Sequence, residues 1–150
     1  MSLLTDFFIC VPATVFFAVL FRVPWKAVFP SALAGAAGYV LYEVTAPVLG
    51  SDMAGYFMGA LLTAVCSEVL ARALRMPATV FAVTTIIPLV PGIGMYDTML
   101  DLVQSQNAKA AATGAATILD IVAIAMAMVL TATLTRVITS AVRYARAPRR

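Results

Sequence analysis

Hydrophobic residues gather in five long stretches, and the short segments between them hold most of the charges. The stretches cover approximately residues 4–21, 31–49, 53–71, 78–96 and 110–134. A helix that crosses a bilayer needs roughly 20 mostly apolar residues, and each stretch is close to or above that length. We therefore predict an all-α membrane protein with five transmembrane helices, which form a single integral-membrane domain over residues 1–150.

The fourth stretch contains a run that a helix cannot pass through unchanged. Residues 86–96 read Ile-Ile-Pro-Leu-Val-Pro-Gly-Ile-Gly-Met-Tyr. Pro88 and Pro91 lack a backbone N–H, and each ring clashes with the carbonyl four residues earlier. Gly92 adds backbone freedom. We predict that this helix is interrupted between Pro88 and Gly92. The break, which runs on to Tyr96, is either a permeation or substrate site, or a kink that packing makes tolerable.

In lipid, an unpaired backbone group survives only where protein or water satisfies it. The break should leave the carbonyls of residues 84–87 without donors, so we expect it to face the protein interior. Thr84 and Thr85 precede it directly, and their hydroxyls can bond nearby carbonyls. We therefore include both threonines among the candidate pathway residues.

Composition narrows the class of protein. The 150 residues are 63% hydrophobic and only 11% charged, whereas a soluble domain usually carries about 25% charged residues. The net charge of +3 is not accompanied by a nucleic-acid-binding motif, so we expect no nucleic-acid partner. There is no histidine, and Cys10 and Cys66 lie singly in different stretches. Neither a disulfide, a metal site nor a cofactor is expected.

The charges between the stretches are sorted by sign. With five spans, nine of the ten basic residues fall on one side, and Lys109 is the exception. The positive-inside rule makes that side the cytoplasm. We predict a periplasmic N-terminus and a cytoplasmic C-terminus. The basic residues on the cytoplasmic side are Arg22, Lys26, Arg72, Arg75, Arg136, Arg143, Arg146, Arg149 and Arg150.

Small residues predict close contacts between helices. Gly35 and Gly38 share one face of the second stretch, and Gly55 and Gly59 form a GxxxG pair in the third. Gly114 lies among alanines in the fifth stretch. Such faces let helix backbones approach closely. The chain should therefore belong to a compact bundle or a larger assembly.

Acidic residues inside the stretches are candidate functional groups, because ionisable groups in lipid are costly and usually face a bundle interior or water. Asp120 lies near the middle of the fifth stretch, with no basic residue at similar depth. It is either a proton carrier or cavity residue, or a structural acid held by hydrogen bonds. Glu43, beside Tyr39 and Tyr42, either lines an outer vestibule or reaches the interface. Asp6 is expected at the interface.

Glu68 and Arg72 stand four residues apart, which places both side chains on one helix face. We expect a local ion pair near the cytoplasmic end of the third helix. This pair is assigned a structural role.

Two blocks of this sequence resemble the threonine/serine exporter (ThrE) family. One runs from Arg75-Met-Pro-Ala-Thr-Val-Phe to Ile87-Pro-Leu-Val-Pro-Gly-Ile-Gly-Met-Tyr96, and the other is Gly35-Ala-Ala-Gly-Tyr39. The resemblance covers nearly the whole chain and is closest to the stand-alone small (YjjB-like) subunit of split members. It implies half of a two-part bacterial inner-membrane exporter that works with a larger five-span partner subunit.

The resemblance also implies a substrate class. Family substrates are small amino acids such as threonine and serine, and split members look more like exporters of small dicarboxylates such as succinate. We expect the proton gradient to drive export. Transporter sites often form where two repeats meet near the midplane, which suits a five-span half with packing faces.

Two other functions are possible from the sequence. A membrane-embedded enzyme is disfavoured, because there is no histidine, no HExxH motif and no acidic cluster at metal-ligand spacing. A non-transporting membrane assembly or scaffold protein is the main alternative. Flux of a substrate from proteoliposomes distinguishes a transporter from both.

Overall fold

The computed structural model describes the backbone of residues 3–146 and the side chains of residues 3–141, and within this range it is helical without strands. The elements are α1 (Leu3–Leu20), α2 (Trp25–Leu49), α3 (Asp52–Leu74), α4 (Ala78–Ile86), a 3-10 turn (Ile87–Leu89), α5 (Gly92–Val103) and α6 (Asn107–Arg146). Four helices, α1, α2, α3 and α6, are long and apolar enough to cross a membrane. A fifth crossing is formed if α4 and α5, which meet at a bend of 53°, count as one span.

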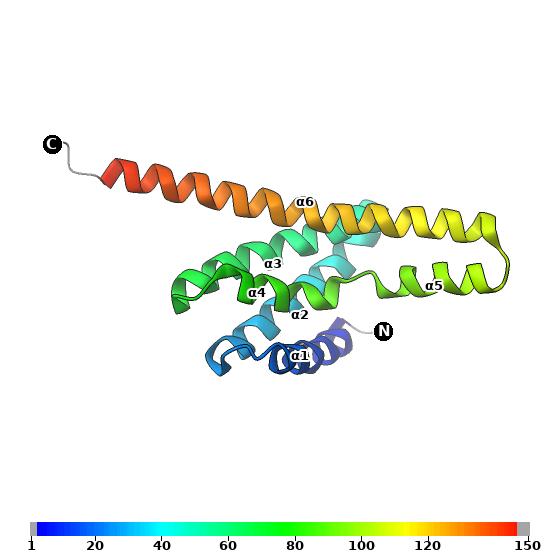
Figure 1. The fold of residues 1–150 in the computed structure, drawn as a ribbon, viewed down its shortest axis with the longest axis horizontal. Helices are drawn as coiled ribbons and strands as arrows, with labels where there is room; N and C mark the ends of the chain where they lie inside the picture. Colours follow the sequence, from blue (N-terminus) through cyan, green and yellow to red (C-terminus); the bar gives the residue numbers. More distant parts are fainter. Residues whose placement is uncertain (1–2, 147–150) are drawn as a thin grey trace.

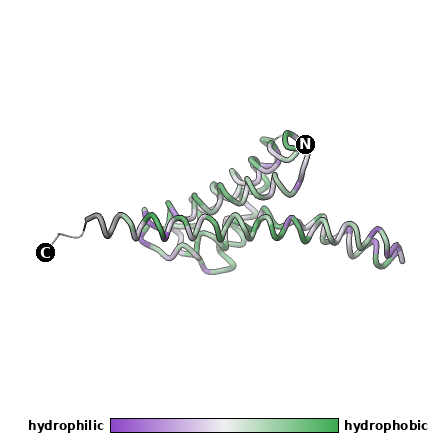
Figure 2. Tube along the Cα trace, turned by 90° about the horizontal axis from the view of Figure 1, so that it is seen from above, coloured by the Kyte–Doolittle hydropathy of each residue, from purple (hydrophilic) through white to green (hydrophobic). Residues whose placement is uncertain are grey.

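The helices run back and forth along one long axis. α6 extends along the whole molecule, and α5 lies antiparallel to its first part (Figure 1). The α5–α6 hairpin projects beyond one end of the group formed by α1 to α4 (Figure 1). Polar residues are concentrated at the helix connections and at the hairpin tip, while the helices between them are mostly hydrophobic (Figure 2). This distribution is the one expected of membrane-crossing helices.

Four tight turns connect helices of this chain, and each contains one residue in the left-handed region. These residues are Arg22, Gly50, Arg75 and Ser105, with φ between 53° and 62°. At the α2–α3 turn, the Gly50 N–H donates to Ala46, and Ser51 caps α3 by accepting from the Ala54 N–H at 3.4 Å. A left-handed residue at a helix C-terminus ends the helix and reverses the chain within a few residues.

Two helices differ in extent from the stretches that the sequence predicts. α2 begins at Trp25, six residues before the predicted start, and Pro30 lies inside it. Pro30 cannot donate to the Lys26 carbonyl four residues earlier, and one residue on, the Ser31 hydroxyl donates to the Ala27 carbonyl at 2.7 Å. α6 has 40 residues rather than the 25 predicted. It continues beyond the apolar region in both directions.

Small residues make up most of the core. The buried hydrophobic residues are mainly alanines, with Phe81 and Leu89 the largest fully buried side chains among the described residues. The Cβ of an alanine at Gly55 would lie 2.7 Å from the Cβ of Ala46, so α2 and α3 pack with their backbones close together. The predicted role of the glycine faces in close helix contact is therefore confirmed.

Candidate functional site

The broken segment separates α4 from α5. α4 ends at Ile86, Val90 has extended backbone (φ −63°, ψ 126°), and α5 begins at Gly92 after Pro91. The carbonyl of Ile87, which would accept from residue 91 in a continuous helix, instead accepts from the Val90 N–H at 3.2 Å. The interruption predicted from the prolines is confirmed.

Leu89 anchors the broken segment in the interior of the bundle. Its side chain is fully buried and fits a notch between Gly38 of α2 and Gly59 of α3. A Cβ added at Gly59 would lie 2.9 Å from Leu89 Cδ2 and 2.7 Å from the Gly38 carbonyl oxygen. The break thus faces protein at Leu89 and Pro91, both buried, while Val90 and Gly92 are exposed.

Gly35 receives the segment just before the break. A Cβ at Gly35 would lie 3.1 Å from the Thr85 carbonyl oxygen and 3.4 Å from Pro88 Cγ. The buried hydroxyls of Thr84 and Thr85 were expected to serve carbonyls 84–87, but they donate backward, to the carbonyls of Val80 and Ala82. The Thr85 hydroxyl also bonds Ser67 of α3 at 3.0 Å. These threonines therefore hold α4 together and tie it to α3.

A polar pocket opens at the end of the bundle where α2 turns into α3. It has a volume of about 710 Å³ and lies among the start of α1, the last turns of α2, the first turn of α3 and the start of α5. Its polar and aromatic lining comes from Tyr39, Tyr42, Glu43, Ser51 and Asp52. Ile93, in the first turn after the break, forms part of its rim. Glu43 lines this pocket, and its role in an outer vestibule stays a prediction.

Two carboxyl groups meet in the wall between α1 and α2. Asp6 of α1 lies near Glu43 of α2. Asp6 is buried, with 8% exposure, and its Oδ2 has no hydrogen-bond partner. Packing of α1 on α2 covers this residue, which the sequence analysis did not predict, while its expected place at the membrane interface stays a prediction.

The backbone adds an acceptor beside the same carboxyl group. Pro47 lies inside α2 and has no N–H to donate to the Glu43 carbonyl four residues earlier. The Glu43 carbonyl therefore has no helix donor at residue 47, which also lines the pocket. Carboxylate and free carbonyl oxygens together suit a cationic ligand.

A line of tyrosines connects this pocket with α6. The rings of Tyr39 and Tyr42 are 5.8 Å apart, and Tyr42 stacks on Tyr56 of α3 with centroids 4.1 Å apart. Tyr56 in turn packs against a buried cluster that includes Ile124 and Ala127 of α6. Aromatic faces of this kind bind organic cations. These tyrosines are site residues that the sequence analysis did not select, although the spacing of Tyr39, Tyr42 and Glu43 was visible.

Asp120 lies in the first half of α6, and its predicted depth in the membrane stays a prediction. It is partly exposed on α6 and interacts electrostatically with Asp52, in the first turn of α3. It therefore lies toward the acidic end of the molecule, together with Asp6, Glu43 and Asp52. The middle of the 40-residue α6 is several residues later, because the helix continues well beyond the apolar stretch.

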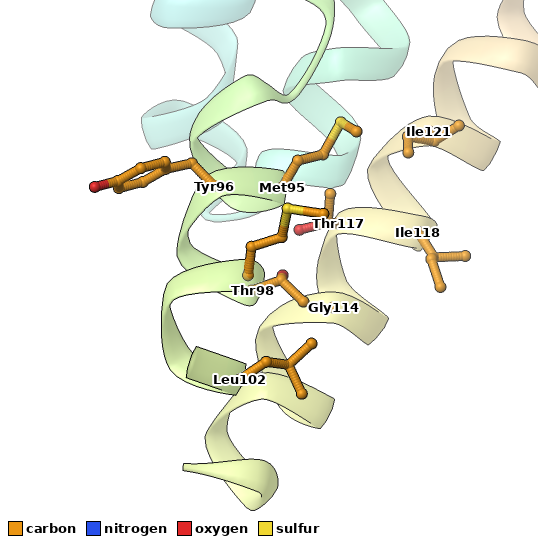
Figure 3. Close-up of a pocket in the computed structure, with 9 residues that line it drawn as sticks. Met95, Tyr96, Thr98, Leu102, Gly114, Thr117, Ile118 and Ile121 are labelled. Carbon is orange, nitrogen blue, oxygen red and sulfur yellow. The ribbon is translucent and has the colours of Figure 1, made fainter. Parts of the chain in front are cut away.

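The α5–α6 hairpin is held together by small residues and one ion pair. Lys109 Nζ lies 2.8 Å from Oδ1 of Asp101, whose side chain is almost completely buried. A Cβ at Gly94 would collide with the Thr117 hydroxyl, and one at Gly114 would lie 3.1 Å from Thr98 Cγ2. Along the hairpin runs an apolar groove of about 440 Å³ that includes Met95, Thr117, Ile118 and Ile121 (Figure 3).

Tyr96 lies on the α5–α6 hairpin, outside the polar pocket. Tyr96 is 65% exposed, and its ring extends away from α6 (Figure 3). Gly92 has no atoms within 4 Å of where a Cβ would lie. Glu43 thus lines the polar pocket, and Asp120 lies toward the acidic end of the molecule. Pro88, Thr84 and Thr85 lie in the bundle. Gly92 and Tyr96 lie on the exposed hairpin side.

Basic residues occupy the opposite end. Arg22 and Lys26 flank the α1–α2 turn, and Arg72 and Arg75 the α3–α4 turn. The two turns meet through a cluster of buried residues, Ala27, Ala71 and Phe81. The predicted Glu68–Arg72 pair is present at 3.9 Å, and Arg72 also donates to Thr139 of α6 at 2.9 Å. The side chains of Arg143, Arg146, Arg149 and Arg150 lie outside the described residues.

A comparison with known protein families identifies the family of this chain. Residues 6–134 match the family described as "Threonine/Serine exporter, ThrE". No curated protein and no solved structure matches the chain. The matched segment contains the polar pocket, the break and the hairpin.

Proposed function

Because this chain belongs to the threonine/serine exporter family, we propose that it is a subunit of a secondary exporter that moves a small amine-bearing metabolite out of a bacterial cell. The family is one of transporters, and the apolar helices make the chain a multi-pass membrane protein. The observation that carries the proposal is the acidic pocket, whose rim includes Ile93 in the first turn after the α4–α5 break.

The pocket suits the ammonium group of a small amino acid. Glu43 and Asp52 line it, Asp6 lies behind Glu43, and the tyrosine faces border it. Among the described basic side chains, Lys109 is bound to Asp101 on the hairpin, and the others lie at the opposite end. The acidic lining favours substrates with an ammonium group, such as threonine and serine, over dicarboxylates such as succinate, which have none.

Proton coupling is proposed at the same place. A carboxyl pair that shares one proton can release it when a cationic group arrives, since the ligand's charge replaces that of the proton. We propose that Asp6 and Glu43, which lie near each other, act as such a pair. The proton gradient would then drive export through alternate loading of this pair by proton and substrate.

The proposal also includes an orientation of the chain in the membrane and an assembly with a partner subunit. The acidic end faces the periplasm and the basic end the cytoplasm, according to the positive-inside rule, with five crossings in the inner membrane. The larger five-span partner subunit completes the pathway, because in this chain the pocket is open on one side of the bundle and the hairpin groove is uncovered.

Counterflow in proteoliposomes tests the function. Vesicles that contain the chain and its partner subunit are loaded with unlabelled threonine, and uptake of labelled threonine is measured. Glu43→Gln should weaken apparent threonine affinity by roughly tenfold to a hundredfold, the equivalent of one charge-assisted hydrogen bond. Asp97→Asn, an acid on α5 outside the pocket, is the matched control. Exchange of succinate in place of threonine would show that the amine assignment is wrong.

A further inference from the structure

A second pocket lies at the basic end, far from the acidic one. It has a volume of about 590 Å³ and is formed by the last turns of α3, the start of α4 and the second half of α6. Its polar lining comes from Glu68, Arg72, Thr135, Arg136, Thr139 and Ser140. Four of these, Thr135, Arg136, Thr139 and Ser140, follow the segment that matches the exporter family.

Arg72 spans the pocket from α3 to α6. Its Nη2 donates to Thr139 Oγ1 at 2.9 Å and lies 3.9 Å from Glu68 Oε2. Thr139 uses its own proton to donate to the Thr135 carbonyl at 2.7 Å, which leaves its oxygen turned toward the guanidinium. The Arg72 side chain is 55% exposed, so its remaining N–H groups face the open pocket.

The start of α4 adds further donors. Pro77 precedes the helix, and no side chain caps it. The first N–H groups of a helix lack partners within it, and the helix dipole makes this end partly positive. Ala78 and Thr79 line the pocket at this point. The cavity therefore contains two guanidinium groups, hydroxyls and an open helix N-terminus, against one carboxylate that is already paired with Arg72.

This set of groups is selective for an oxyanion. A guanidinium binds phosphate with two parallel N–H bonds, and hydroxyls and helix N–H groups bind the remaining oxygens. The pocket lies at the end where basic residues gather, and basic pockets between helices on the cytoplasmic side bind anionic lipid headgroups. Val137 and Ile138, next to Arg136, are about 60% exposed and are available to contact acyl chains.

We infer that this pocket binds the phosphate of an anionic phospholipid, which links the second half of α6 to the α3–α4 turn. The inference does not depend on the proposed transport function. Bound lipid would add contacts between α6 and the rest of the bundle, and it would therefore stabilise the folded chain.

Lipid titration of the purified full-length chain in detergent tests the inference. Native mass spectrometry should detect phosphatidylglycerol binding at least fivefold tighter than phosphatidylcholine binding, and phosphatidylglycerol should raise the melting temperature. Arg136→Gln and Thr139→Val should each remove most of this preference. Lys26→Gln, a basic residue at the same end but outside the pocket, should retain it.

Two results would overturn the inference. If Lys26→Gln reduced the preference as much as Arg136→Gln, the effect would be one of general positive charge. If inorganic phosphate or succinate at millimolar concentration stabilised the chain as well as phosphatidylglycerol, with the same loss in Arg136→Gln, the site would be one for a soluble anion.

Discussion

Leu89 packs its side chain against the bare backbone of Gly59. The side chain of Leu89 comes from the break between α4 and α5, and Gly59 lies in the middle of α3, where a Cβ would approach Leu89 Cδ2 to 2.9 Å. The same Cβ would lie 2.7 Å from the Gly38 carbonyl oxygen, which belongs to the backbone and cannot rotate away. The break is thus held in place by a glycine on each of two helices.

Gly59→Ala should destabilise the chain, because α2 and α3 must separate to admit the methyl group. Overpacking of this kind typically costs about 1–3 kcal/mol. Gly92→Ala is the matched control, since a Cβ there would meet open space. The free energy of unfolding in mixed micelles gives the comparison. Equal stability of the two variants would show that the close packing at Gly59 is not required.

Replacement of both Pro88 and Pro91 by alanine should straighten the α4–α5 segment, since alanine restores the missing N–H donors. Spin labels on α4 and α5 should report a longer distance between them as the 53° bend opens. Transport should fall severalfold at equal expression, while stability is retained. Pro30→Ala, in an uninterrupted helix, is the control. Wild-type flux in the double variant would make the break a structural feature only.

The hairpin ion pair should respond asymmetrically to mutation. Asp101 is almost completely buried, whereas the Lys109 side chain is 66% exposed. Lys109→Gln leaves a buried carboxylate without its cation, while Asp101→Asn leaves an ammonium that water can solvate. We expect Lys109→Gln to lower the melting temperature more. Hydrogen exchange of α5 amides should increase in the same order, and the reverse order would contradict this account.

Asp6→Asn should separate proton coupling from substrate binding. The amide keeps the shape of Asp6 but cannot exchange a proton with Glu43, so gradient-driven export should fall at least tenfold while threonine counterflow continues. Asp120→Asn provides the comparison, because Asp120 belongs to the same acidic end but is partly exposed. If Asp120→Asn lost gradient-driven export and Asp6→Asn did not, the coupling proton would be assigned to α6.

The orientation of the chain in the membrane can be measured with variants that each carry one introduced cysteine. Ser105→Cys at the hairpin tip should react with a membrane-impermeant maleimide in intact cells, whereas Ser140→Cys at the basic end should react only after permeabilisation. The chain with only its native Cys10 and Cys66 measures background labelling, since both thiols are partly buried. The opposite labelling pattern would reverse the proposed topology.

Features that depend on local chemistry were predictable from the sequence. The break follows from two prolines three residues apart, and the close helix contacts follow from glycine spacing. These effects act within one or two turns of a helix, so a single chain segment determines them.

Features that depend on the packing of helices against one another were not predictable from the sequence. Burial of Asp6 and its contact with Glu43 require α1 to lie against α2, which neither segment determines alone. The length of α6 was underestimated because hydropathy falls before helix formation ends, and no glycine or proline occurs between Gly114 and Pro148. The basic pocket was missed for the same reason, since Thr139 and Ser140 fall beyond the apolar stretch.

The length of α6 has a mechanical consequence. Its 40 residues form one continuous rod of about 60 Å, twice the roughly 30 Å thickness of the hydrocarbon core. A rod that pivots where it packs on α3 moves its two ends in opposite directions, and a tilt of about 10° displaces each end by about 5 Å. The hairpin and the arginine pocket lie on opposite sides of this pivot, so a tilt of α6 that moves one of them also moves the other.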